Sequence, residues 1–218
     1  MTLQRLPDGT QNPAWVKDRQ GKLGGSMIGK IITQKKPGEL TQGAITLARK
    51  LALERYYGRS FCYAPPENED IMRGIESEPS ALAEYELVKG LLLSPARWVE
   101  HPDIEGAGAT PDAFSGLDGL VQAKAPRYDN YAMAIVSGKF PADHVDQMQW
   151  EMAVTKRKWN DLVLYCSEFP DGQRIWVRRL HADPERIAVL ENQARLFLAE
   201  VEAIFDALPS LNFIEETD

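Results

Sequence analysis

The sequence is poor in the side chains that hold soft metals or form disulfides. It has two cysteines and three histidines in 218 residues. Cys62 and Cys166 lie far apart and show none of the spacings typical of zinc or redox sites. The sequence therefore excludes a zinc finger and a Cys-x-x-Cys oxidoreductase, and we expect both thiols to be buried and reduced.

Long hydrophobic runs are also lacking. The longest run, around Leu91–Leu93, is far too short to cross a bilayer, which takes about 20 residues. The first residues lack the apolar centre of a signal peptide, and no internal repeat is present. We expect no membrane segment, a cytoplasmic location and, at this length, a single domain over residues 1–218.

Positive charge is in deficit. The chain carries 25 Lys and Arg against 32 Asp and Glu, a net charge of −7. This balance argues against indiscriminate binding to nucleic acids, but an acidic outer face can coexist with a locally basic groove. The basic positions that could form such a groove, or simply a solvated surface, are Lys35, Lys36, Arg55, Arg59, Arg73, residues 156–158, Arg178 and Arg179.

The hydrophobic periodicity predicts alternating helices and strands. Pro79 should kink the helix expected at about 71–92 or mark its restart. The order of the elements predicts an α/β fold with a mixed central β-sheet flanked by helices. Helices are expected at about 13–19, 40–57, 71–92, 129–137, 142–157 and 184–208, and strands at about 96–101, 108–114, 119–125, 161–167 and 173–180.

The most informative pattern is a polar hairpin centred on residues 115–119. Asp112 precedes this turn, and Gln122 and Lys124 follow it. Because strand side chains alternate between faces, Gln122 and Lys124 should point one way and Ala123 the other. Two carboxylates and a lysine on adjacent strands can hold Mg²⁺ beside a phosphate and a water, although the same pattern also fits an ordinary solvated hairpin.

Other polar positions extend this pattern. Glu78, on the helix before the strands, offers another carboxylate, and Gln147 offers an amide from the helix that follows. Near the N-terminus, Arg19 and Ser26 flank a glycine pair, and this combination suits a terminal phosphate. Taken singly, these residues are also compatible with a solvated helix face, a surface amide and a helix cap.

Taken in order, these residues resemble the phage lambda-type alkaline exonucleases, which are viral recombination exonucleases of the restriction-endonuclease-like PD-(D/E)xK superfamily. The resemblance covers about residues 13 to 180 and implies a restriction-endonuclease-like core. It is carried by Trp15, Arg19, Ser26, Gly74, Glu78, Ala81, residues 110–112, Lys124, Pro126, Gln147, Gln149, Val154 and Thr155.

The resemblance implies roles for individual residues. The metal ligands would be Asp112, Glu78, position 122 and the backbone carbonyl of Ala123, and they would hold two Mg²⁺ ions that Mn²⁺ can replace. Lys124 would activate the attacking water, and Gln122 and Gln147 would complete the catalytic set. Arg19, Ser26 and Thr110 would bind the 5′-phosphate of DNA.

The resemblance also implies an activity and an organisation. Family members are homotrimers that digest one strand of double-stranded DNA from its 5′ end, which leaves a 3′ overhang for a single-strand annealing protein. In this chain, residues 1–60 would form a helical N-terminal part with the 5′-phosphate pocket. Residues 70–181 would form the nuclease core, and residues 183–208 a C-terminal helix.

Two positions depart from the family pattern. Pro79 directly follows Glu78 and could reshape the helix that presents it. Gln122 places a neutral amide where the pattern has Glu or Asp, so we expect weaker metal binding and a rate lower by about two or more orders of magnitude. Gln122 is either a natural variant that is compensated elsewhere or a substitution made to trap uncleaved DNA, and we favour the second explanation.

Two other functions remain open at this stage. If Gln122 is native, the chain could be a catalytically inactive protein that binds DNA ends and loads a recombinase. A site-specific endonuclease could use the same core, but no recognition domain is evident in 218 residues.

Overall fold

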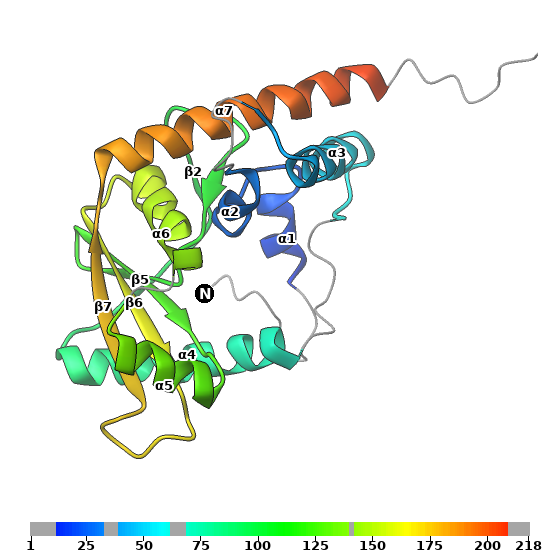
Figure 1. The fold of residues 1–218 in the computed structure, drawn as a ribbon. Coiled ribbons are helices and arrows are strands. Elements are labelled where there is room, and N and C mark those ends of the chain that lie inside the picture. The colour runs from blue at the N-terminus through cyan, green and yellow to red at the C-terminus, as the bar shows by residue number, and fades with distance from the viewer. Residues whose placement is uncertain (1–11, 33–38, 62–68, 140–141, 209–218) are drawn as a thin grey trace, which may run out of the picture.

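The computed structural model describes residues 12–32, 39–61, 69–139 and 142–208 (Figure 1). Helical elements come first, and groups of strands and helices follow them. The elements are α1 (Pro13–Arg19), η1 (Gly25–Met27), α2 (Ile28–Ile31), α3 (Gln42–Tyr57), α4 (Glu69–Lys89), β1 (Ser94–Pro95), β2 (Val99–Glu100), β3 (Gly108–Ala109), β4 (Ala113–Ser115), β5 (Gly119–Lys124), α5 (Tyr128–Ser137), α6 (Ala142–Thr155), β6 (Trp159–Tyr165), β7 (Ile175–His181) and α7 (Pro184–Ala207).

A five-stranded mixed sheet forms the centre, in the order β1-β4-β5-β6-β7. β5 and β6 pair in parallel, and the other neighbours pair antiparallel. Alternation along the strands separates the two faces, because Val121 and Ala123 pack on the side of Tyr85 of α4, whereas Leu162 packs with Met148 of α6 on the other side. The predicted α/β fold with a mixed sheet flanked by helices is confirmed.

A helical layer stands beside the sheet. Helices α2, α3, α6 and α7 share one apolar core, and α7 crosses one end of the molecule above α3 and α6 (Figure 1). Leu51 and Phe197 are fully buried in this core. The N-terminal helices are thereby fixed next to the segment that enters the sheet at β4.

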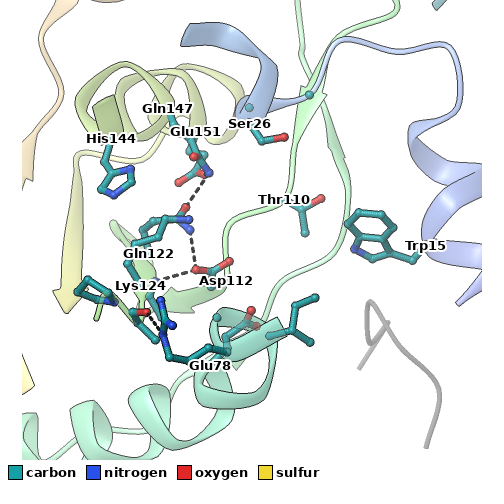
Figure 2. A pocket seen from close by; sticks show the side chains of 18 of the residues that line it. Trp15, Ser26, Glu78, Thr110, Asp112, Gln122, Lys124, His144, Gln147 and Glu151 are labelled. Carbon is teal, nitrogen blue, oxygen red and sulfur yellow. Dashed lines mark hydrogen bonds between the residues drawn. The ribbon is translucent and has the colours of Figure 1, made fainter. Parts of the chain in front are cut away.

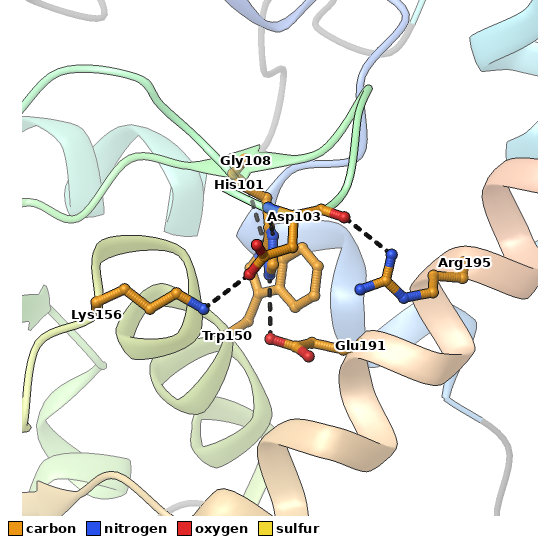
Figure 3. Close-up of polar contacts among 7 residues, drawn as sticks. All are labelled: His101, Asp103, Gly108, Trp150, Lys156, Glu191 and Arg195. Atoms are coloured by element: carbon orange, nitrogen blue, oxygen red, sulfur yellow. Dashed lines mark hydrogen bonds and ion pairs between the residues drawn. The ribbon is translucent and has the colours of Figure 1, made fainter.

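The strand pair β2–β3 is anchored to α6 and α7 by buried polar contacts (Figure 3). His101 Nε2 lies 3.3 Å from Glu191 Oε1 of α7, and burial lowers the pKa of His101. Trp150 of α6 donates from its ring nitrogen to the carbonyl oxygen of Gly108 at 3.0 Å. These contacts fix the chain just before Thr110, so the residues that follow β3 have a defined position.

Local sequence accounts for several features of the chain. Asn12 caps α1 by accepting from the backbone nitrogen of Ala14 at 3.0 Å. Gly58 ends α3 with φ of 64°, a conformation that glycine adopts without a steric penalty. The turn at 115–119 joins β4 and β5 as an antiparallel hairpin, as the sequence predicts.

The expected restart of the helix at Pro79 is wrong. Helix α4 runs without interruption from Glu69 to Lys89 with Pro79 inside it. The ring of Pro79 is exposed, so its main cost is the hydrogen bond that its missing N–H would have made. The spacing of Leu82, Tyr85, Val88 and Leu92 predicts one buried face, but Val88 and Leu92 are 60% and 86% exposed. Leu92 lies beyond the end of the helix at Lys89.

Several of the predicted basic positions are held in ion pairs. Lys156 pairs with Asp103, Lys158 with Asp118, and Arg55 with Glu202. Lys35, Lys36 and Cys62 lie outside the described residues, and Cys166 is buried. Among the helices of the described ranges, none is long and apolar enough to cross a membrane.

Candidate functional site

A cavity of about 710 Å³ lies where α4, α6, η1 and the β4–β5 hairpin meet (Figure 2). Every residue that the sequence nominates for catalysis, metal binding or phosphate binding lines it. Its walls also include Arg73, one of the predicted basic positions, and His144 and Glu151, which the sequence does not single out. The nominated residues are Arg19, Ser26, Glu78, Thr110, Asp112, Gln122, Ala123, Lys124 and Gln147.

The hairpin register places Asp112 beside Gln122. Ala113 pairs with Val121, so the residues just beyond this pair face each other across the two strands. Gln122 Nε2 donates to Asp112 Oδ2 at 2.6 Å, and the backbone nitrogen of Ala123 donates to the same oxygen at 2.7 Å. One carboxylate oxygen of Asp112 is thus held by two donors from β5.

Glu78 faces this pair from helix α4. Burial raises the pKa of Glu78 to about 8, and the negative charge of Asp112 adds to the shift while Lys124 opposes it. Burial also raises the pKa of Asp112, against the opposing effects of Lys124 and the Ala123 amide. The two carboxyl groups are close enough for each to affect the ionisation of the other.

Glu151, on α6, is a third carboxylate at this site. It is 1% exposed, and burial followed by the charge of Asp112 raises its pKa to about 8. Gln147 Nε2 donates to Glu151 Oε1 at 2.9 Å and to Gln122 Oε1 at 3.2 Å. The sequence does carry a signal for Glu151, because a residue four positions after Gln147 lies on the same face of a helix.

The opposite wall of the cavity is formed by residues that carry a positive charge or a hydroxyl group. Arg19 is buried, donates to Thr110 Oγ1, and also donates to the carbonyl oxygen of Trp15 at 2.6 Å. Its guanidinium carbon lies 3.8 Å from the centroid of the Trp15 ring. Ser26 is exposed on η1 at the same wall, so the structure brings the three nominated phosphate-binding residues together.

The cavity offers carboxylate and carbonyl oxygens to a metal ion. Within the described ranges, no three His, Cys, Asp or Glu side chains are arranged to hold a metal ion by themselves. The carboxylates of Asp112 and Glu78, with the backbone carbonyl of Ala123, are nevertheless the donor type that Mg²⁺ and Mn²⁺ take. Burial raises the pKa of Glu78 and of Glu151, and the charge of Asp112 adds to both shifts, so a bound cation would favour the ionised carboxylates.

Comparison with known proteins gives one family and several structural relatives. Residues 14–158 match the YqaJ-like viral recombinase domain. The alkaline exonuclease of Laribacter hongkongensis is 31% identical, with a TM-score of 0.81 over 90% of this chain and 95% of that one. A structure of the same exonuclease in complex with dAMP gives 31% identity and a TM-score of 0.80 over 89% and 95% of the two chains.

A more distant relative shares the fold. The phage-related exonuclease of Haemophilus somnus 129PT is 16% identical, with a TM-score of 0.67 over 86% of this chain and 96% of that one. No protein with curated functional information matches the chain significantly. The resemblance to alkaline exonucleases that the sequence indicates is therefore confirmed.

Proposed function

Because the chain belongs to the YqaJ-like viral recombinase family and shares the fold of an alkaline exonuclease, we propose that it is a metal-dependent 5′→3′ exonuclease acting on double-stranded DNA. One observation carries this proposal. One cavity contains several carboxylates and Lys124 on one side and the Arg19–Thr110 pair on the other. A DNA end that enters it can place a phosphodiester at the carboxylates and a phosphate at the arginine.

The acidic side would hold the metal. Asp112, Glu78, the Ala123 carbonyl and the side chain at position 122 would bind two Mg²⁺ ions, and Mn²⁺ would substitute. When bound, such ions polarise the phosphodiester and lower the pKa of a bound water. Burial raises the pKa of Asp112 and of Glu78, and a cation bound between them would favour their ionised forms, which supports this role.

Lys124 and Gln147 would handle the attacking water. The ammonium of Lys124 lies on the same strand as position 122 and lowers the pKa of both Glu78 and Asp112. A positive charge there stabilises a developing hydroxide and the charge that builds up on the phosphate. The Gln147 amide, held between Gln122 and Glu151, would orient the water.

The opposite wall would read the end of the strand. Arg19 is held against the Trp15 ring and bonded to Thr110, so its guanidinium is ordered before DNA arrives. An ordered guanidinium with two nearby hydroxyls, those of Thr110 and Ser26, suits the terminal 5′-phosphate. The dAMP complex of the Laribacter enzyme supports a mononucleotide product.

The wider function follows from this chemistry. Removal of one strand from a 5′ end leaves a 3′ overhang, which a single-strand annealing protein would take up for recombination. A homotrimer enclosing the duplex would gather the few cavity-lining cations, such as Arg73 and Arg127, around a chain whose net charge is −7.

Gln122 favours one alternative. A neutral amide at this position weakens the metal site, so the chain could bind DNA ends and load a recombinase without cutting. Incubation with linear and with closed circular duplex DNA in Mg²⁺ separates the functions. The exonuclease degrades only the linear form and stops when EDTA is added. An inactive loader shifts the linear form in a gel and leaves both forms intact.

A further inference from the structure

Glu151 places a carboxylate close to the neutral amide of Gln122 on the hairpin. Glu151 Oε1 and Gln122 Oε1 accept from the same nitrogen of Gln147, at 2.9 and 3.2 Å. The end of the side chain at position 122 and the Glu151 carboxylate therefore meet at one amide group (Figure 2). The first comes from strand β5 and the second from helix α6, and both line the cavity that contains Asp112.

Other buried carboxylates in the described part of the chain have evident structural partners. Asp161 forms a bidentate ion pair with Arg179, with hydrogen bonds of 2.8 and 2.9 Å. Glu54 accepts from backbone nitrogens at Gly21 and in the turn after α3. Glu151 differs from both, because its hydrogen bonds come only from neutral side-chain amides and no ion pair neutralises it within the described ranges.

The amide donors favour the ionised, metal-binding form of Glu151 against the opposing effect of burial. Asn160 Nδ2 donates to Glu151 Oε2 at 2.8 Å, while Gln147 donates to the other oxygen. Hydrogen bonds from neutral amides favour the ionised carboxylate without cancelling its charge. Each oxygen also keeps a second lone pair for another partner, which a cation can occupy.

We infer that Glu151 supplies the anionic metal ligand that the amide at position 122 cannot provide. The third carboxylate of the site then comes from helix α6 instead of strand β5. This inference rests on the proposed function, because it assigns a ligand to the same metal site. It also supports the first of the two explanations for Gln122, a natural variant whose missing charge is compensated one side chain away.

A purely structural role makes a different prediction. Glu151 could serve only to hold the Gln147 amide in place. Its loss would then slow catalysis but would leave the affinity of the DNA-free protein for a metal ion unchanged. Direct metal binding therefore separates the two roles, and activity alone does not.

The test compares Mn²⁺ binding to the unchanged chain, Glu151→Gln, Gln122→Glu and the double variant. Free Mn²⁺ is followed by electron paramagnetic resonance without DNA, and circular dichroism checks that each form is folded. The isosteric Glu151→Gln should weaken Mn²⁺ binding by about 10-fold or more, as loss of even an indirect metal contact does. Gln122→Glu in the same molecule should restore binding, because the carboxylate returns on the strand.

The matched control is Asp146→Asn. Asp146 lies on the same helix, but it forms an ion pair with Arg186 of α7 at 2.7 Å instead of lining the cavity. This variant should bind Mn²⁺ as the unchanged chain does.

The outcomes distinguish the inference from the proposed function. Equal Mn²⁺ affinity of the unchanged chain and Glu151→Gln overturns the role of Glu151 and leaves the exonuclease proposal standing. If only Gln122→Glu binds Mn²⁺ and digests DNA, Glu151 is not a ligand and position 122 is an impaired one. If no form binds Mn²⁺ or digests DNA, the proposed function itself is wrong.

Discussion

Gln122 donates its amide hydrogen to Asp112 across the β4–β5 hairpin at 2.6 Å. A carboxylate at position 122 could not make this bond when ionised, and the two negative charges would repel each other. Gln122 therefore stabilises the metal-free hairpin, whereas a carboxylate there would need a cation between itself and Asp112. Compared with a carboxylate at position 122, the amide stabilises the metal-free site and lowers the affinity of the site for metal.

We expect Gln122→Glu to make folding depend on metal. In EDTA its free energy of unfolding should fall by about 1–3 kcal/mol, because a buried hydrogen bond is lost and a like charge is added. Saturating Mg²⁺ should recover most of this loss. Urea unfolding with EDTA and with Mg²⁺ measures both effects. A variant as stable in EDTA as the unchanged chain would show that the pair at 112 and 122 is not electrostatically coupled.

Gln122→Glu should also change the rate of DNA digestion. If position 122 contributes to the metal site, Gln122→Glu should digest linear duplex in Mg²⁺ faster than the unchanged chain. Equal rates under identical conditions would mean that position 122 contributes little to the metal site.

Arg19→Lys should remove the preference for 5′-phosphorylated over 5′-hydroxyl ends. Lysine keeps the charge but loses the fork of donors that binds a phosphate with two hydrogen bonds. We expect the ratio of the two rates to fall by about 10-fold, the size of one charge-assisted hydrogen bond. The control is Lys17→Ala, because Lys17 is exposed on the same helix and away from the cavity. An unchanged ratio in Arg19→Lys would show that other residues hold the phosphate.

The stability of the metal-free protein should fall as the pH rises. Burial raises the pKa of Glu78 and of Glu151 from an ordinary value of 4.5 to about 8. Between these values the folded state binds more protons than the unfolded state, so this contribution is complete below pH 4.5 and lost as the pH passes 8. Urea unfolding in EDTA at pH 5 and pH 9 measures the slope, and Glu78→Gln with Glu151→Gln should flatten it. A double variant with the unchanged slope would show that other groups dominate.

The sequence predicts the local parts of this site well. The hairpin follows from a turn between two alternating segments, and this alternation alone places Gln122 and Ala123 on opposite faces. The cap at Asn12 and the stop at Gly58 are likewise local, because each depends on a few neighbouring residues. Local signals of this kind do not depend on how the rest of the chain packs.

The remaining features depend on packing between distant segments. Glu151 approaches Gln122 only because α6 packs with this face toward the hairpin. The sequence of α6 alone does not determine that packing. Contact between Arg19 and Thr110 joins segments 91 residues apart. Pro79 was expected to disrupt α4, but neighbouring turns of the helix are held against the sheet by buried residues such as Tyr85.

The mass in solution should be close to three times 24.5 kDa, because the resemblance to ring-shaped exonucleases implies a homotrimer. Light scattering at micromolar concentration measures it. A monomer would contradict the ring, and it would predict an enzyme that releases DNA after few cuts.

Strand polarity tests the proposed exonuclease most directly. A linear duplex with a 5′-phosphate on one strand, and a label at either the 5′ or the 3′ end of that strand, is digested in Mg²⁺ by the unchanged chain and by Gln122→Glu. We predict that the 5′ label appears at once as a mononucleotide, while the 3′ label stays in steadily shortening fragments. Release of the 3′ label first, internal cuts, or no digestion by either form would contradict a metal-dependent 5′→3′ exonuclease.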